Sequence, residues 1–145
     1  MPTKKKQKKT SPKKEFAAMM VKQVMQKLVQ SARLKTKGDV IASLMIEGFG
    51  SMPVVDAKDE LLGIVSEHDL LAATDDGHKL GAFSVGDIMT CSPYSIHPEA
   101  MLSTLVHVFR ARDLIRVPVV DVKDKLVGII ARRDILRAYP AAGRT

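Results

Sequence analysis

PVVDAKDELLGIVSEHDLLA at residues 53–72 recurs as PVVDVKDKLVGIIARRDILR at residues 118–137, an offset of 65 positions. The two copies share 11 of their 20 residues, and most other positions keep their apolar character, as where Val65 becomes Ile130. A self-similar segment at a fixed offset is typical of one supersecondary unit repeated along the chain. The sequence therefore predicts two structurally equivalent halves.

Each copy has the pattern of a β-hairpin followed by a helix. Pro53 opens a run of β-branched residues, and proline suits the first position of a strand. A polar turn at 56–60 and a second apolar run at 61–65 complete the hairpin. Ser66 then occupies the N-cap position of a helix whose first turn contains the acidic Asp69.

The helix start of the second copy departs from this pattern. Ala131 replaces the capping serine, and Arg132 and Arg133 bring positive charge to a helix N-terminus, where it is unfavourable. A local rule that is kept in one copy and broken in the other can mark function. We interpret the difference as a functional asymmetry between the two halves.

The residues before the first copy predict an amphipathic helix. Ser11 and Pro12 are a typical N-cap and first helical residue. Apolar residues follow at a spacing of four, at Phe16, Met20, Val24 and Leu28. We expect this helix to contact the core or a dimer partner. Whether it continues through residues 29–31, where an extended piece is poorly marked, stays open.

The part of each unit that precedes the hairpin is clearer in the second copy. Residues 92–96 have the pattern of a short extended piece, and a helix starts near Pro98. The first copy has the corresponding apolar helix around residues 40–45. Residues 85–89 also echo residues 21–25, but at an offset of 64, so the first copy lacks one residue between these segments and its hairpin.

The net charge of +7 is concentrated in the first residues of the chain. Seven of the 23 basic residues lie in residues 1–14, which contain no acidic residue. The rest of the chain carries 16 basic and 16 acidic residues. Such a segment is expected to be disordered, and either to aid solubility or to bind polyanions without sequence choice. Without interleaved aromatic residues, nucleic-acid binding is less favoured. We divide the chain into a lysine-rich tail (1–14), a first unit with its N-terminal helix (15–74), a linker (75–84), a second unit (85–140) and a C-terminal tail (141–145).

Several classes of protein are disfavoured by the composition. The single cysteine, Cys91, cannot form an intrachain disulfide, which fits the reducing cytoplasm. No apolar run approaches the roughly 18 residues of a membrane span, and no apolar stretch follows the N-terminal lysines as in a signal peptide. Asp75, Asp76 and His78 match no metal-site spacing, and no set of nucleophile and base stands out. We expect no metal and no enzyme.

The combination of these motifs resembles a pair of CBS domains, the cystathionine β-synthase module, whose tandem form is called a Bateman module. The resemblance rests on PVVD and on a second motif that opens a helix. This motif is a glycine, two apolar residues, a serine or threonine, any two residues and an aspartate, as at residues 63–69. The resemblance covers roughly residues 20–138. DIMTCSPYSIHP at 87–98 is similar to the opening of the family's unit. The resemblance implies an α/β (α+β) fold in which two β-α-β-β-α units pack about a pseudo-twofold axis. Two such modules commonly form a disc-shaped dimer.

The resemblance also implies binding of an adenosyl ligand: AMP, ADP, ATP or S-adenosylmethionine. Ser66 and its backbone N–H lie at a helix N-terminus, which is a ready-made anion site, and Asp69 offers two acceptors to vicinal ribose hydroxyls. Asp134 matches Asp69 in the second copy. By the same resemblance, His68, Arg132 and Arg133 stand where related modules place phosphate ligands, and the base is held near Met52, Pro53, Val117 and Pro118.

Two hypotheses for function follow. The first is a regulatory module that binds an adenosyl ligand between its units, signals by conformational change, and acts as a homodimer on itself or on an unidentified regulated protein. The second is a structural or nucleic-acid-associated dimer that acts through the lysine tail. Ser66 and Asp69 favour the first hypothesis, although a helix cap alone also accounts for them.

Overall fold

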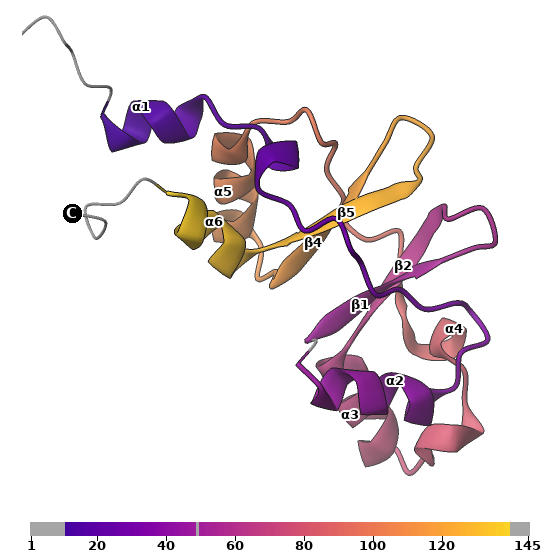
Figure 1. Ribbon diagram of the computed structural model, residues 1–145. Helices are drawn as coiled ribbons and strands as arrows, with labels where there is room; N and C mark the ends of the chain where they lie inside the picture. The colour runs from indigo at the N-terminus through magenta and orange to yellow at the C-terminus, as the bar shows by residue number, and fades with distance from the viewer. Residues whose placement is uncertain (1–10, 49, 140–145) are drawn as a thin grey trace, which may run out of the picture.

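The computed structural model describes residues 11–48 and 50–139, which form two similar halves, each built on a β-hairpin (Figure 1). The first half contains α2 (Gly38–Ile46), β1 (Ser51–Val55), β2 (Leu61–Ser66) and α3 (Glu67–Asp75). The second half repeats the order with α5 (Leu102–Ala111), β4 (Arg116–Val120), β5 (Leu126–Ala131) and α6 (Arg132–Ala138). The predicted α/β architecture of two equivalent units is confirmed.

The hairpins of the two halves have the same register. Strands β1 and β2 are antiparallel and strands β4 and β5 are antiparallel, with the irregularity falling after Val54 in one pair and after Val119 in the other. Asp59 and Asp124, at equivalent turn positions, both adopt a positive φ, of 65° and 63°. The predicted hairpins are therefore present, and their turns are alike.

The two hairpins meet at their turns. The backbone N–H of Leu61 donates to the carbonyl of Asp124 at 3.0 Å, and that of Leu126 donates to the carbonyl of Asp59 at 2.9 Å. Because each bond repeats the other with the halves exchanged, the pair defines the pseudo-twofold relation between the units.

A third extended segment runs parallel to the first strand of each hairpin. Ile96 forms a parallel bridge with Val119, and Ala32 forms the equivalent bridge with Val54. The extended piece predicted at 92–96 is therefore confirmed at Ile96, whereas Ser92 at its start adopts a positive φ of 49°. In the first half the chain is extended at Ala32, so the open alternative of a helix through residues 29–31 is wrong.

The expected long amphipathic helix does not form. Helix α1 (Pro12–Ala17) begins with Ser11 as its N-cap, as predicted, but it ends at Ala17, and only the short 3-10 helix η2 (Val21–Gln23) follows. Met20 is extended and pairs with Met101 of the second half, while Leu28 is 96% exposed. The backbone of residues 20–26 bonds to another part of the chain, and these tertiary bonds override the helical spacing.

Lys13 and Lys14, which we assigned to the lysine-rich tail, lie in helix α1. Lys14 donates its backbone N–H to the hydroxyl of Ser11 at 3.1 Å, inside the first turn of α1. Residues 1–10 and the expected C-terminal tail at 141–145 lie outside the described residues.

Each half is completed by a segment from elsewhere in the chain. Val21 is fully buried in the core of the second half, whereas Val85 is fully buried in the core of the first half. The intervening elements are η3 (Leu80–Ala82), α4 (Val85–Ile88) and β3 (Thr90–Cys91), and β3 pairs with β2. The halves therefore exchange the segments that precede their extended pieces.

Two glycines allow the exchanged segments to approach closely. A Cβ on Gly63 would lie 2.6 Å from the sulfur of Met89, and a Cβ on Gly128 would lie 2.6 Å from the sulfur of Met25. Glycine in a strand often marks such close approach. The two contacts are equivalent, because Gly63 and Gly128 are 65 positions apart and Met25 and Met89 are 64 positions apart, which are the two offsets of the repeat.

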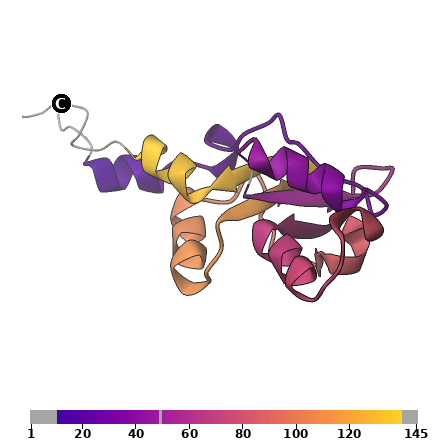
Figure 2. The ribbon, with the colours of Figure 1, turned by 90° about the horizontal axis from the view of Figure 1, so that it is seen from below.

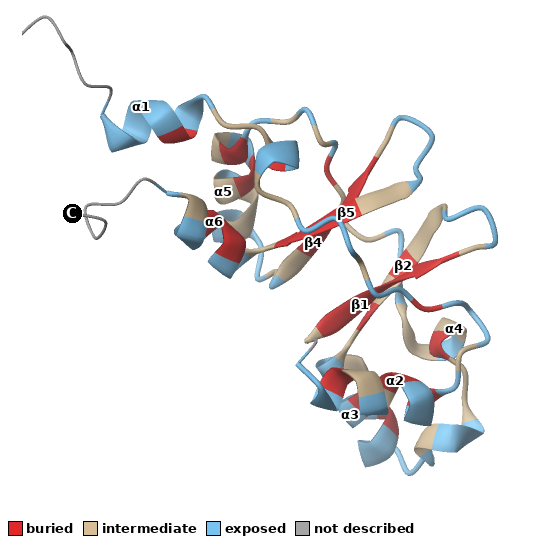
Figure 3. Cartoon of the chain, viewed as in Figure 1, coloured by how far each residue is buried: buried red, intermediate tan, exposed pale blue. Residues whose placement is uncertain are grey.

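The buried residues lie along the strands and on the inner sides of the helices (Figure 3). Helices α1 and α6 lie at the same end of the molecule in both ribbon views (Figures 1 and 2). They touch through Phe16 and Tyr139, so the first and the last described helices close the second half together.

Candidate functional site

A cleft of about 730 Å³ lies between the two halves at the start of α3. Most of its wall belongs to the first half, but the segment just before β4 closes one side. Its lining residues are Gly50, Ser51, Ile64, Ser66, Glu67, His68, Asp69, Leu71, Thr90, Asp113, Leu114, Ile115 and Arg116. A ligand in this cleft would touch both units at once.

Ser66 and Asp69 form a reciprocal cap at the N-terminus of α3. The N–H of Asp69 donates to the Ser66 hydroxyl at 3.2 Å, and the N–H of Ser66 donates to Oδ2 of Asp69 at 2.8 Å. The Ser66 hydroxyl also donates to the same Oδ2 at 3.0 Å. Within the described ranges no donor bonds to Oδ1 of Asp69, so this oxygen is available to a ligand.

Positive charge enters the cleft from the second half. The Nη1 of Arg116 donates to the carbonyl of Ser51 at 2.8 Å, which fixes the guanidinium across the boundary between the units. Burial lowers the pKa of Arg116 and Asp134 acts to raise it. An arginine remains charged despite such burial, so the cleft contains a partly desolvated cation suited to a phosphate.

One polar atom in the wall has no hydrogen-bond partner among the described residues. The hydroxyl of Ser51 is buried, and it makes no hydrogen bond to any described residue. Buried polar side chains are normally hydrogen-bonded, so an orphan of this kind calls for an explanation. A ligand that satisfied Ser51 would provide one.

The cleft brings together only some of the expected site residues. Ser66, His68 and Asp69 line it, as the motif suggested. Arg132 and Arg133 are exposed at the start of α6 and are not among the lining residues. The residues expected to hold the base are buried within strands β1 and β4, at Met52, Pro53, Val117 and Pro118.

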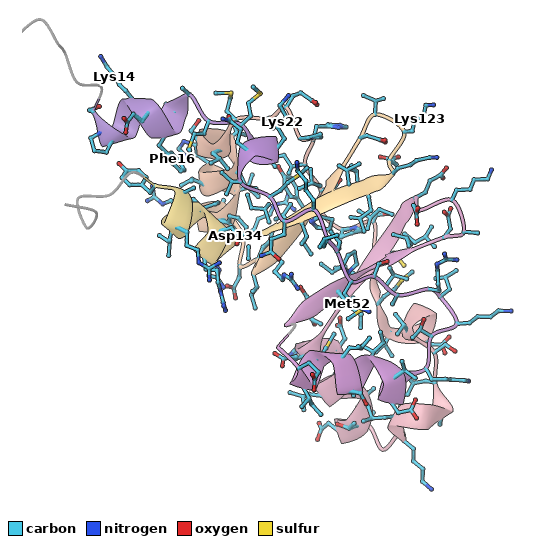
Figure 4. The ribbon with its side chains drawn as sticks, viewed as in Figure 1. Lys14, Phe16, Lys22, Met52, Lys123 and Asp134 are labelled. Carbon is cyan, nitrogen blue, oxygen red and sulfur yellow. The ribbon has the colours of Figure 1, made fainter. Side chains whose placement is uncertain are left out.

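Asp134 differs from Asp69 in its surroundings. It is 6% exposed at the start of α6 (Figure 4), and its Oδ2 accepts from the N–H of Ala131 at 2.8 Å. The side-chain amide of Gln26 donates to both of its oxygens, at 3.1 and 3.2 Å, and Arg137 lies 3.7 Å from Oδ1. Both oxygens of this carboxylate are therefore occupied.

Sequence reasoning missed Arg116 and Thr90 as cleft residues. Arg116 precedes the repeated PVVD and aligns with Ser51, so nothing in the repeat marked it. Thr90 belongs to the DIMT motif, but only its pairing with Ile64 brings it beside α3. The DIMT motif could have drawn attention to Thr90. Its pairing with Ile64 could not be predicted, because it depends on the exchange of segments between the halves.

The described ranges also bear on metal sites and membrane spans. These residues contain no group of three or more histidine, cysteine, aspartate or glutamate side chains placed to hold a metal ion. No helix in them is long and apolar enough to cross a membrane.

Comparison with known proteins agrees with the geometry. The family model of the CBS domain matches residues 21–76 and again residues 85–141. A CBS domain-containing protein of Dictyostelium discoideum is 31% identical over 129 residues, covering 81% of this chain and 89% of the relative. An inosine-5'-monophosphate dehydrogenase of Methanocaldococcus jannaschii is 33% identical over 111 residues, but the chain spans only 21% of that enzyme.

Solved structures with the same fold include proteins with bound adenosyl compounds. CBSX2 in complex with AMP matches with a TM-score of 0.75 at 28% identity, over 83% of this chain and 96% of that one. CBSX2 is a CBS-pair protein from Arabidopsis thaliana. The CBS domain pair of protein MJ0100, in complex with 5-methylthioadenosine and S-adenosyl-L-methionine, matches with a TM-score of 0.74 at 25% identity, over 82% and 98% of the two chains.

Proposed function

Because the chain belongs to the CBS-domain family, we propose that its cleft is a regulatory site for an adenosyl ligand, either an adenine nucleotide or S-adenosylmethionine. The observation that carries the proposal is Oδ1 of Asp69, to which no described residue donates a hydrogen bond, in a cleft that the cation of Arg116 closes from the other half. The AMP and S-adenosylmethionine complexes of CBSX2 and MJ0100 support the choice of ligand class.

The residues suggest how such a ligand would be held. Asp69 accepts a ribose hydroxyl through Oδ1, which makes a charge-assisted bond. A phosphate would sit between Arg116 and the N-terminus of α3, where helix N–H groups favour an anion. Ile64 and Leu114 offer apolar contacts to a base. Ser66, His68 and Asp69 keep the ligand-binding roles proposed from the sequence, and Arg116 takes the phosphate role first given to Arg132 and Arg133.

The same arrangement explains how binding would be transmitted. The cleft wall comes from both halves, so a ligand that bridges Asp69 and Arg116 stabilises one relative position of the units. A ligand shifts a conformational equilibrium only through differential contacts with its states. Signalling to a regulated protein would use this shift, and the chain would act in this way without catalysing a reaction, in the reducing cytoplasm that its single cysteine favours.

A thermal-shift screen with AMP, ADP, ATP and S-adenosylmethionine tests the proposal. A ligand that binds only the folded state raises the melting temperature by mass action, and one of the four compounds should do so in a concentration-dependent way. Adenosine and inorganic phosphate, tested separately, show which part of the ligand supplies the affinity. If none of the compounds changes the melting temperature, the proposal is wrong.

Dimerisation through the helices remains part of the proposal. An apolar groove of about 330 Å³ lies between α2 and α3, and Ile46, which lines it, is 84% exposed. Leu136 on α6 is 76% exposed on the other half, at the position equivalent to Leu71. Static light scattering should give a dimer that Ile46→Asp dissociates, whereas a monomeric wild-type protein would contradict the proposal. Any polyanion binding by residues 1–14 should weaken steeply with salt.

A further inference from the structure

Gln26 and Thr90 occupy equivalent places in the two halves. Gln26 pairs with Ile129 of β5, exchanging backbone hydrogen bonds at 2.8 and 3.0 Å. Thr90 pairs with Ile64 of β2. Gln26 and Thr90 are 64 positions apart and their partners 65, the two offsets of the repeat. Each residue therefore lies on the segment donated to the other half, next to the strand that leads into the aspartate.

The two side chains differ in what they do to that aspartate. The Nε2 of Gln26 donates to both carboxylate oxygens of Asp134. Within the described residues Thr90 makes no such bond to Asp69, which keeps Oδ1 open and is half-buried rather than 6% exposed. At equivalent backbone positions, Thr90 therefore leaves the carboxylate of Asp69 open, whereas Gln26 covers the carboxylate of Asp134.

The Gln26 amide satisfies the carboxylate as a ligand would. Vicinal ribose hydroxyls offer a carboxylate two O–H donors, and the NH₂ of a glutamine side chain offers two N–H donors. Gln26 is itself exposed, so its amide covers Asp134 from the solvent side without being part of the core. Removing this amide would uncover the carboxylate without opening a cavity in the packed interior.

From this we infer that Gln26 is an intramolecular substitute for the ribose at the second site, and that it limits each chain to one adenosyl ligand. The stoichiometry rests on the proposed function of the first cleft, whereas the covering of Asp134 does not. Ala131 acts in the same direction, because the helix that begins there has no hydroxyl at its N-cap.

The covering can be tested without any ligand. Carboxyl footprinting with carbodiimide and glycine ethyl ester, read by mass spectrometry, reports how accessible each carboxylate is. Gln26→Thr should raise labelling of Asp134 about threefold or more, with Asp69 as the reference in the same sample. Gln30→Thr, at an exposed position of the same segment, is the matched control and should leave labelling unchanged. Equal labelling of Asp134 in wild type and Gln26→Thr would overturn the inference.

Calorimetry with AMP then tests the stoichiometry. The wild type should bind one AMP per chain, and Gln26→Thr combined with Ala131→Ser should bind a second. The reciprocal Thr90→Gln should place an amide on Asp69 and weaken AMP binding about tenfold or more. Two AMP molecules on the wild type would overturn the inference. Increased labelling of Asp134 without heat from AMP in any variant would support the covering of Asp134 and contradict AMP as the ligand of the first cleft.

Discussion

The rings of Phe16 and Tyr139 stand 5.1 Å apart between centroids, tilted by 44°. Phe16 belongs to the first described helix, and Tyr139 is the C-cap of the last one. Since Phe16 is only 7% exposed and lies in the core of the second half, this contact makes α1 an integral part of that half.

We expect Phe16→Ala to destabilise the protein by about 3 kcal/mol, because truncating a buried phenylalanine loses apolar burial and leaves a cavity. The measurement is urea unfolding followed by circular dichroism. Lys22→Ala, on an exposed side chain of the same segment, is the control and should change the free energy of unfolding by less than about 0.5 kcal/mol. A loss no larger than that of the control would show that α1 does not pack in solution.

Truncation from the N-terminus should have a sharp limit. Removing residues 1–10 should leave the free energy of unfolding and AMP affinity unchanged, because the sequence of that segment has no apolar residue beyond Met1 and Pro2. Removing residues 1–18 deletes Phe16 and should cost about as much stability as Phe16→Ala. Thermal unfolding of both truncated proteins checks this. An equal loss from both deletions would place a structural role in the first ten residues.

Substitution of Asp69 should mainly affect AMP affinity, whereas substitution of the equivalent Asp134 should mainly affect stability. Asp69→Ala should weaken AMP binding about tenfold or more, because a charge-assisted hydrogen bond contributes roughly 1.5–3 kcal/mol. Asp134→Ala should weaken AMP binding much less than Asp69→Ala does but lower stability by about 1–3 kcal/mol, because it leaves the partly buried N–H of Ala131 without its acceptor. Calorimetry and urea unfolding of both variants separate the effects. Equal effects on AMP affinity would mean that the halves are functionally alike.

The turns of the two hairpins predict an acid dependence of stability. Backbone N–H groups, that of Glu60 first, lower the pKa of Asp56 below its usual 3.8, and those of Lys125 and Lys123 lower the pKa of Asp121. A carboxyl whose pKa is lower in the folded state adds stability above its unfolded pKa and loses it as the pH falls through the folded pKa. The free energy of unfolding should therefore decrease as the pH is lowered below about 4.

Asparagine substitutions isolate this contribution. The double variant Asp56→Asn with Asp121→Asn should unfold with a shallower pH dependence below about pH 4, since the amide oxygen still accepts but does not titrate. Asp75→Asn, at an exposed position at the end of α3, is the control. Chemical unfolding across that pH range checks the slopes, and identical slopes in all three proteins would contradict the assignment.

The local features of the fold could be predicted from the sequence because their causes are local. A strand-opening proline, a polar turn and a capping serine determine the hairpin and the start of α3, and each recurs in the second copy at an offset of 65. The N-terminal helix was mispredicted because the backbone N–H groups of Val21 and Lys22 donate to the carbonyls of Ala100 and Pro98 instead. Such non-local pairing leaves no periodicity to read.

The candidate site was predicted only where one segment supplies it. Ser66, His68 and Asp69 lie within four consecutive residues, so the motif alone placed them together. Arg116 enters the cleft from the other half and Gln26 reaches its aspartate across 108 positions. Their roles follow from the packing of the halves, which a repeat pattern does not encode.

The exchange of segments has a consequence for synthesis on the ribosome. Residues 20–26 emerge well before their partners Ala100, Ile129 and Asp134. The first half likewise waits for Val85, which is made after its own hairpin and α3. Long sequence separations between contacting residues slow folding. A nascent chain released or cleaved between the halves would therefore expose incomplete cores, and intact folding is expected only once residues 16–135, which contain the residues of both cores, have left the exit tunnel.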